Sequence, residues 1–173
     1  MTGDWVERCR WHEPGGIAAA RTIAGFLAGI GIAVETGPVA ADSPLPGMTA
    51  RAGRLVIDPA VPAYPGDLLH EAGHLALCDP ATRDQTDDVG DDPGDEMGAI
   101  AWSVAAATAC GIPLETLFHP AGYRGWSPAL PAAFAKGRGF GIAILACYDM
   151  TAEPHRAAQS GLAPFPAMAR WLR

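Results

Sequence analysis

Basic residues are scarce in this chain of 173 residues. Lys136 is the only lysine, and 12 basic residues stand against 19 acidic ones, which gives a formal net charge of −7. Proteins bind nucleic acids largely by neutralising phosphates with lysine and arginine, and this chain has no run of such residues. We therefore expect no direct contact with nucleic acid.

Long apolar runs and closely spaced cysteines are also missing. The nearest approach to a membrane span, residues 23–34, is too short and rich in glycine. The first ten residues carry acids where a signal peptide has an apolar core. The four cysteines lie far apart and form no CxxC pair: Cys9, Cys78, Cys110 and Cys147. We expect a cytoplasmic protein without membrane contact, with free thiols and no four-cysteine zinc site.

The composition is that of a folded protein, with 49% hydrophobic and 18% charged residues. The length suits one domain, 1–173, and the patterns predict an α+β fold that is mainly helical. We expect a short β-sheet beside the central helix. The expected helices are 17–34, 67–78, 92–111, 114–118, 128–136, 140–150 and 164–173, with a strand at 52–58, a loop at 37–50 and a turn at 59–66.

The most informative motif is His-Glu-Ala-Gly-His at residues 70–74. Residues four apart lie on the same face of a helix, so His70 and His74 can bind one metal ion. Glu71 is placed to take a proton from a water on that metal. The apolar residues of this helix form a stripe nearly opposite the histidines: Leu68, Leu69, Ala72, Leu75 and Ala76. One side of the helix is thus predicted to pack into the core while the other faces a cleft.

A second helix supplies the expected third ligand. Asp92 and Pro93 are typical of an N-cap and a first helical position, and Gly111 of a C-terminal end. Glu96 heads an otherwise apolar face of this helix, where a carboxylate is costly unless it is paired or bound to metal. Alternatively, the Glu96 side chain points into solvent and is stabilised only by the positive end of the helix dipole. Asp95 is the reserve candidate.

An acidic run surrounds the start of that helix, at residues 84–96, and contains no basic residue. Such a run is most simply a solvated loop. Two alternatives are that it covers the entrance of the cleft or that it binds a second cation. Acids within 91–95 are candidates for orienting the two histidine rings.

Hydrolysis also needs a donor for the oxyanion of the tetrahedral intermediate. Four residues are candidates, and each is also explained by packing or surface exposure: Tyr148, Tyr123, His119 and His155. Tyr148 is the first choice because a compact apolar segment would hold it rigidly. Cys78 lies four residues after His74. Its side chain either approaches the metal or is a small buried hydrophobic group. His12 is expected at the surface.

Residues 52–113 resemble the ImmA/IrrE family of bacterial metallopeptidases. The likeness lies in the Gly-x-x-x-Ile-Asp-Pro strand, the HExxH-Leu-x-Leu helix and the acid-led helix that follows. In the last of these, Glu96, Ala99 and Trp102 match the family pattern, whereas Gly98 stands where the family often has a second Glu. The resemblance implies a zincin-like domain whose zinc is held by two histidines and a glutamate. It also implies a protein target such as a transcriptional repressor.

Together the residues and the resemblance predict a zinc metalloendopeptidase. In this interpretation His70, His74 and Glu96 hold Zn²⁺, Glu71 is the general base, and Tyr148 contributes to catalysis. The strand at 53–58 pairs with an extended substrate. An alternative is a noncatalytic module that uses zinc for structure and sequesters a regulator. A third interpretation is a helical protein in which the His pair is structural.

Overall fold

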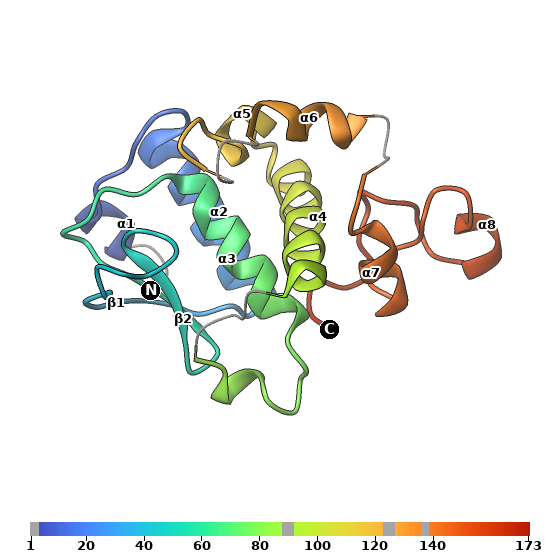
Figure 1. The fold of residues 1–173 in the computed structure, drawn as a ribbon, viewed down its shortest axis with the longest axis horizontal. Helices are drawn as coiled ribbons and strands as arrows, with labels where there is room; N and C mark the ends of the chain where they lie inside the picture. Colours follow the sequence, from blue (N-terminus) through green and yellow to red (C-terminus); the bar gives the residue numbers. More distant parts are fainter. Residues whose placement is uncertain (1–3, 88–91, 123–126, 136–138) are drawn as a thin grey trace.

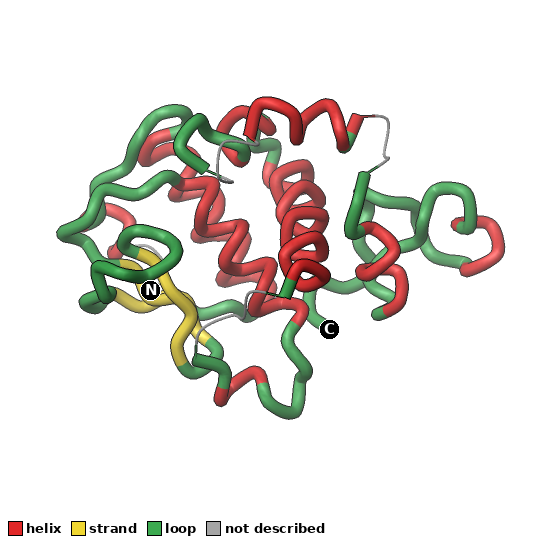
Figure 2. The backbone as a smooth tube through the Cα atoms, viewed as in Figure 1, coloured by secondary structure: helices red, strands yellow, loops and turns green. Residues whose placement is uncertain are grey.

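The computed structural model describes residues 4–87, 92–122, 127–135 and 139–173. Over these residues the chain has the predicted mainly helical α+β fold, with a small sheet at one side (Figures 1 and 2). Its elements, in chain order, are α1 (Asp4–Arg8), α2 (Gly16–Ile30), β1 (Val34–Thr36), β2 (Met48–Arg51), β3 (Arg54–Ile57), α3 (Pro65–Leu77), the 3-10 helix η1 (Arg83–Gln85), α4 (Pro93–Cys110), α5 (Leu114–Leu117), the 3-10 helix η3 (Ser127–Ala129), α6 (Leu130–Ala133), α7 (Ile142–Cys147) and α8 (Ala157–Ser160).

The sheet has the strand order β1-β3-β2, so β3 is central. β3 pairs in parallel with β1 and antiparallel with β2, where Arg51 lies opposite Arg54. The two residues between them, Ala52 and Gly53, both have positive φ (46° and 71°), as a two-residue hairpin turn of type I′ requires. The prediction of a loop over all of 37–50 is therefore wrong at its end. The prolines and glycines of segment 37–50 favoured the interpretation as a loop, although β2 begins at Met48. The turn after β2 gave no signal either, because Ala-Gly is not a typical hairpin-turn sequence.

The tip of this hairpin rests on the start of the acidic run. The Ala52 amide donates to Asp87 Oδ1 at 2.7 Å, and the Gly53 amide donates to the Thr86 carbonyl at 3.2 Å. A Cβ at Gly53 would come within 2.7 Å of the Arg83 carbonyl oxygen. Asp87 is exposed, as expected of a solvated segment, yet it also anchors the hairpin. Residues 88–91 of the run lie outside the described residues.

Helix α3 carries the HExxH motif through the middle of the molecule (Figure 1). Its first helical residue is Pro65, two residues before the predicted start. The side chain of Arg83 donates to the carbonyl oxygens of Leu75, Ala76 and Cys78 and so satisfies acceptors that the end of a helix leaves open. Nearly every residue of α3 is buried, including the side that the sequence assigns to a cleft.

Helix α4 lies against α3 and begins and ends as predicted. The Asp92 side chain accepts hydrogen bonds from the amides of Gly94 and Asp95, and Gly111 forms a left-handed C-cap. The two helices approach closely because α3 has a glycine at the crossing. A Cβ on Gly73 would lie 2.8 Å from the Ala99 carbonyl oxygen.

Two predicted helices differ from the structure. Helix α2 ends at Ile30 rather than at residue 34, because Gly31 adopts a left-handed conformation that ends the helix. Residues 164–173 form no helix, and that prediction is wrong. Their amides bond to distant segments, since Ala169 donates to the Met150 carbonyl and Arg173 to the Ala76 carbonyl. The segment is nevertheless attached to the core: Phe165 is buried, and Met168, Trp171 and Leu172 pack against the core.

The remaining helices confirm the predictions in part. Helix α5 matches the predicted segment 114–118, and α7 lies within 140–150. The predicted helix 128–136 is present as η3 followed by α6, and Lys136 lies outside the described residues. None of the described helices combines the length and hydropathy that a segment crossing a bilayer needs.

Candidate metal centre

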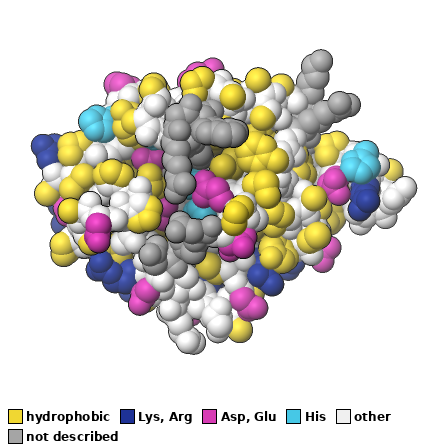
Figure 3. All heavy atoms as spheres, viewed as in Figure 1, with side chains coloured by type: hydrophobic (Ala, Val, Ile, Leu, Met, Phe, Trp, Pro, Cys, Tyr) yellow, Lys and Arg dark blue, Asp and Glu magenta, His cyan; other side chains and the backbone are white. Residues whose placement is uncertain are grey.

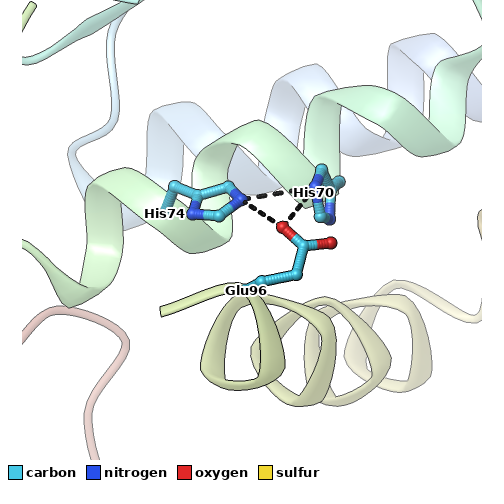
Figure 4. A group of neighbouring side chains, drawn as sticks. All are labelled: His70, His74 and Glu96. Atoms are coloured by element: carbon cyan, nitrogen blue, oxygen red, sulfur yellow. Dashed lines mark hydrogen bonds and ion pairs between the residues drawn. The ribbon is translucent and has the colours of Figure 1, made fainter. Parts of the chain in front are cut away.

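Three of the predicted site residues converge on one point. His70, His74 and Glu96 each direct one ligand atom toward the others, and these atoms all lie within 4.8 Å of one another (Figure 4). The two Nε2 atoms are 3.3 Å apart. Glu96 Oε2 lies 3.2 Å from His74 Nε2 and 3.6 Å from His70 Nε2. Among the described residues this is the one group with the donors and spacing to hold a metal ion.

The backbone explains how the three side chains meet. His70 and His74 are one turn apart on α3, while Glu96 is in the first turn of α4. The close approach of the two helices at Gly73 brings that first turn beside the histidines. The Ser103 hydroxyl, farther along the same face of α4, lies within hydrogen-bond distance of the Ala99 carbonyl of its own helix at 2.7 Å and of the Leu69 carbonyl of α3 at 3.1 Å. Asp95, the reserve candidate, is exposed and is not a member of the group.

The three ligands differ in exposure. The side chains of His70 and His74 are 12% and 6% exposed, whereas that of Glu96 is 46% exposed. Of the three ligands, Glu96 is therefore the one most exposed to solvent. Figure 3 shows histidine and acidic side chains meeting near the middle of one face of the molecule, with hydrophobic side chains beside them.

Electrostatics keep His70 ready to bind a cation. The pKa of His70 is lowered to about 4, chiefly by burial and secondly by the neighbouring His74, while Glu96 and Asp67 act in the opposite direction. The imidazole is therefore neutral at physiological pH, and a neutral imidazole is the form that binds metals.

Glu71 lies next to His70 on α3 and is 7% exposed. It is thus a buried acid at the position that the motif assigns to the general base. Its role in proton transfer stays a prediction.

The candidates for the oxyanion donor lie in different places. Tyr148 is the C-cap of α7, and the Arg173 guanidinium lies 4.0 Å from the centre of its ring. His155 is exposed, 3.9 Å from Glu153. His119 is buried and bonded to Asp67 at 2.8 Å. Tyr123 lies outside the described residues. The catalytic role assigned to Tyr148 stays a prediction.

Two further residues are accounted for without metal binding. The Cys78 thiol donates to the His74 carbonyl at 3.4 Å, and Cys78 is not a member of the metal-binding group. His12 is exposed, as predicted, and its ring packs on that of Tyr64 with centroids 4.7 Å apart.

Asp67 is a second buried acid on the helix that carries the two histidines, and it was not among the residues predicted from the sequence. Of the expected candidates within 91–95, Asp92 caps α4, Asp95 is exposed, and Asp91 lies outside the described residues. Asp67 lies one turn before His70, so the i, i+3 spacing was the signal that could have identified it.

Comparisons with protein families, with curated proteins and with solved structures gave no match to this chain. The resemblance to the ImmA/IrrE family accordingly remains a prediction, and the geometry of the site carries the argument.

Proposed function

We propose that the protein is a zinc-dependent metallopeptidase that hydrolyses a peptide bond in a protein target. The observation that carries this proposal is the convergence of His70, His74 and Glu96 at the positions that the motif predicts. Two imidazoles and one carboxylate are the ligand set of many catalytic zinc sites, which keep a fourth position for water or substrate.

The spacing of the ligand atoms favours zinc. Ligands at about 2.0–2.1 Å from a tetrahedral zinc ion lie roughly 3.3 Å from one another. The three observed separations are 3.2, 3.3 and 3.6 Å. The mixed nitrogen and oxygen donors argue against calcium and magnesium, which prefer oxygen ligands alone.

The protein residues divide the chemistry between them. Zinc bound there would supply an acidified water and a polarised substrate carbonyl. Glu71 takes the proton of the attacking water and passes it to the leaving amine. His70, neutral at physiological pH, needs no deprotonation before it binds the cation.

The sheet offers a place for an extended substrate, although not at the strand that we first expected. β3 has a neighbour on both sides and therefore has no free edge. The prediction that strand 53–58 pairs with substrate is wrong for this reason. β2 is an edge strand of the described sheet and contacts α3, so its outer edge takes over this role in the proposal.

The test is cleavage by zinc-loaded protein, compared with Glu71→Gln. Both forms are incubated with a proteome-derived peptide library and with repressor proteins encoded beside the gene, and new termini are identified by mass spectrometry. We expect cleavage by the wild type, loss of nearly all cleavage in Glu71→Gln, and equal zinc content in both. A chelator should abolish cleavage and added zinc should restore it.

The same comparison separates the peptidase from a noncatalytic binding module. A module that sequesters a regulator has no use for a general base. Zinc-loaded wild type that cleaves nothing, and whose binding to a repressor is unchanged by Glu71→Gln, would overturn the peptidase proposal in favour of the module.

A further inference from the structure

A second buried polar group lies close to the metal centre and has no part in the chemistry described above. A hydrogen bond of 2.8 Å joins His119 Nε2 to Asp67 Oδ1. The two side chains are 2% and 12% exposed. A carboxylate can only accept, so the imidazole is the donor.

The chain holds this pair firmly in place. The first turn of α3 packs directly on the backbone of α5, since a Cβ at Gly66 would lie 2.4 Å from the Thr116 carbonyl oxygen. This contact brings His119, two residues after α5, against Asp67. The ring of Tyr64 stacks on that of His119, with centroids 3.7 Å apart and planes within 6°.

The pair is placed to act on the metal centre. Asp67, His70 and His74 recur at i, i+3 and i+7 on α3, so they share one face of the helix, with Asp67 one turn before the first ligand. A carboxylate one helical turn from His70 is close enough for its charge to act on a cation bound there.

Stability alone does not explain these residues. Burying an acid and an imidazole costs desolvation that a pair of apolar residues would avoid. In addition, the second ring nitrogen of His119, Nδ1, is buried and has no hydrogen-bond partner among the described residues. A buried nitrogen in that state is destabilising, which favours a functional reason for the imidazole.

We propose that Asp67 and His119 are positioning residues of the metal centre, in which His119 orients the buried Asp67 carboxylate so that its negative charge strengthens cation binding at His70 and His74. The inference rests on the metal-binding part of the proposed function and is independent of peptidase activity. Partners that act on a metal through its ligands typically contribute ten- to a hundredfold to affinity.

The test is zinc affinity, measured by competition with a chromophoric chelator. Asp67→Asn removes the charge and keeps the shape, and we expect it to weaken zinc binding by about tenfold or more. His119→Leu leaves Asp67 without its donor and should weaken binding similarly. His119→Gln can still donate to Asp67 and should retain most of the wild-type affinity. Asp42→Asn, which removes an exposed acid in a loop, is the control for net charge and should change affinity less than twofold.

Two measurements separate positioning from simple structural support. Thermal unfolding of the metal-free proteins reports how much stability each substitution removes through lost packing. His119→Leu and His119→Gln should differ in this loss. The visible spectrum of the cobalt-substituted proteins reports the ligand geometry, and we expect it to change in Asp67→Asn and His119→Leu but not in His119→Gln.

The outcomes distinguish this inference from the proposed function. If the wild type binds zinc, and Asp67→Asn and His119→Leu bind it equally well with unchanged cobalt spectra, the pair is only structural and this inference is overturned. If Asp67→Asn does not fold, the comparison of Leu with Gln at position 119 decides in the same way. A wild type that binds no zinc overturns both proposals.

Discussion

At the scale of single residues, the metal centre depends on side chains whose ionisation is set by burial. His70 is 12% exposed, and burial is the main reason for its low pKa. Burial keeps the imidazole neutral, which suits cation binding. In the metal-free protein the same burial destabilises the folded state at acidic pH, because the folded imidazole resists protonation. Glu96, in contrast, is nearly half exposed.

This difference predicts how the stability of the metal-free protein depends on pH. An unfolded histidine takes up a proton near pH 6.5, whereas folded His70 does so only near pH 4. Protons therefore favour the unfolded state, and the stability that is present above pH 6.5 is lost as the pH falls through 4. The loss amounts to about 3 kcal/mol at most.

The measurement is urea unfolding in the presence of a chelator, followed by tryptophan fluorescence between pH 4 and 7. His70→Asn lacks the titrating group, so its free energy of unfolding should vary less steeply with pH than that of the wild type. Equal slopes for the two proteins would contradict the assignment of the low pKa to His70.

At the scale of elements, the centre depends on how closely α3 and α4 pack. The glycine within the HExxH motif lies at their crossing, where a Cβ at Gly73 would meet the Ala99 backbone. An added methyl group must push α4 away, and Glu96 moves with it.

We therefore expect Gly73→Ala to weaken zinc binding and to destabilise the fold by about 1–3 kcal/mol. Gly25→Ala is the matched control, because Gly25 lies inside α2 with nothing within 4 Å of its added Cβ. That change should stabilise the protein by about 0.5–1 kcal/mol and leave zinc affinity unchanged. Chelator competition and thermal unfolding measure both effects. Normal zinc affinity in Gly73→Ala would refute the link between helix packing and the site.

Elements with strong local signals could be predicted from the sequence. Asp92-Pro93 and Gly111 mark the ends of α4, and the HExxH spacing places both histidines on one face of α3. β2 could not be predicted, because its turn uses Ala52 at positive φ, a conformation that a non-glycine residue rarely adopts. Asp67 could have been found from its spacing, but its partner His119 lies 52 residues away and needed the tertiary structure.

At the scale of the whole molecule, the non-helical segment 164–173 contacts both α2 and α4. Trp102 on α4 donates its indole N–H to the Trp171 carbonyl at 2.9 Å. The ring of Trp171 lies edge-on to both Trp102 and Phe26, at 5.6 and 4.8 Å between centroids. The apolar spacing of this segment matched a helix, but its backbone bonds to Met150 and Ala76. Such long-range pairing leaves no periodic signal in a sequence.

Substitution at Trp171 tests this role. Trp171→Ala removes the ring contacts with α2 and α4, and we expect it to lower the free energy of unfolding by about 2–4 kcal/mol. Trp171→Phe retains an aromatic ring and should cost less than about 1.5 kcal/mol. Denaturant unfolding of the two variants checks the difference. Equal stabilities would mean that the segment is only loosely attached.

The most direct test of the whole account is a crystal structure of the zinc-loaded protein with anomalous data collected at the zinc edge. The account predicts one zinc ion per chain, bonded to His70 Nε2, His74 Nε2 and Glu96 Oε2 at about 2.0–2.2 Å, with a fourth ligand that is not a protein side chain. An anomalous map without a peak at this point, or an ion held by a different set of protein ligands such as Cys78, would contradict it.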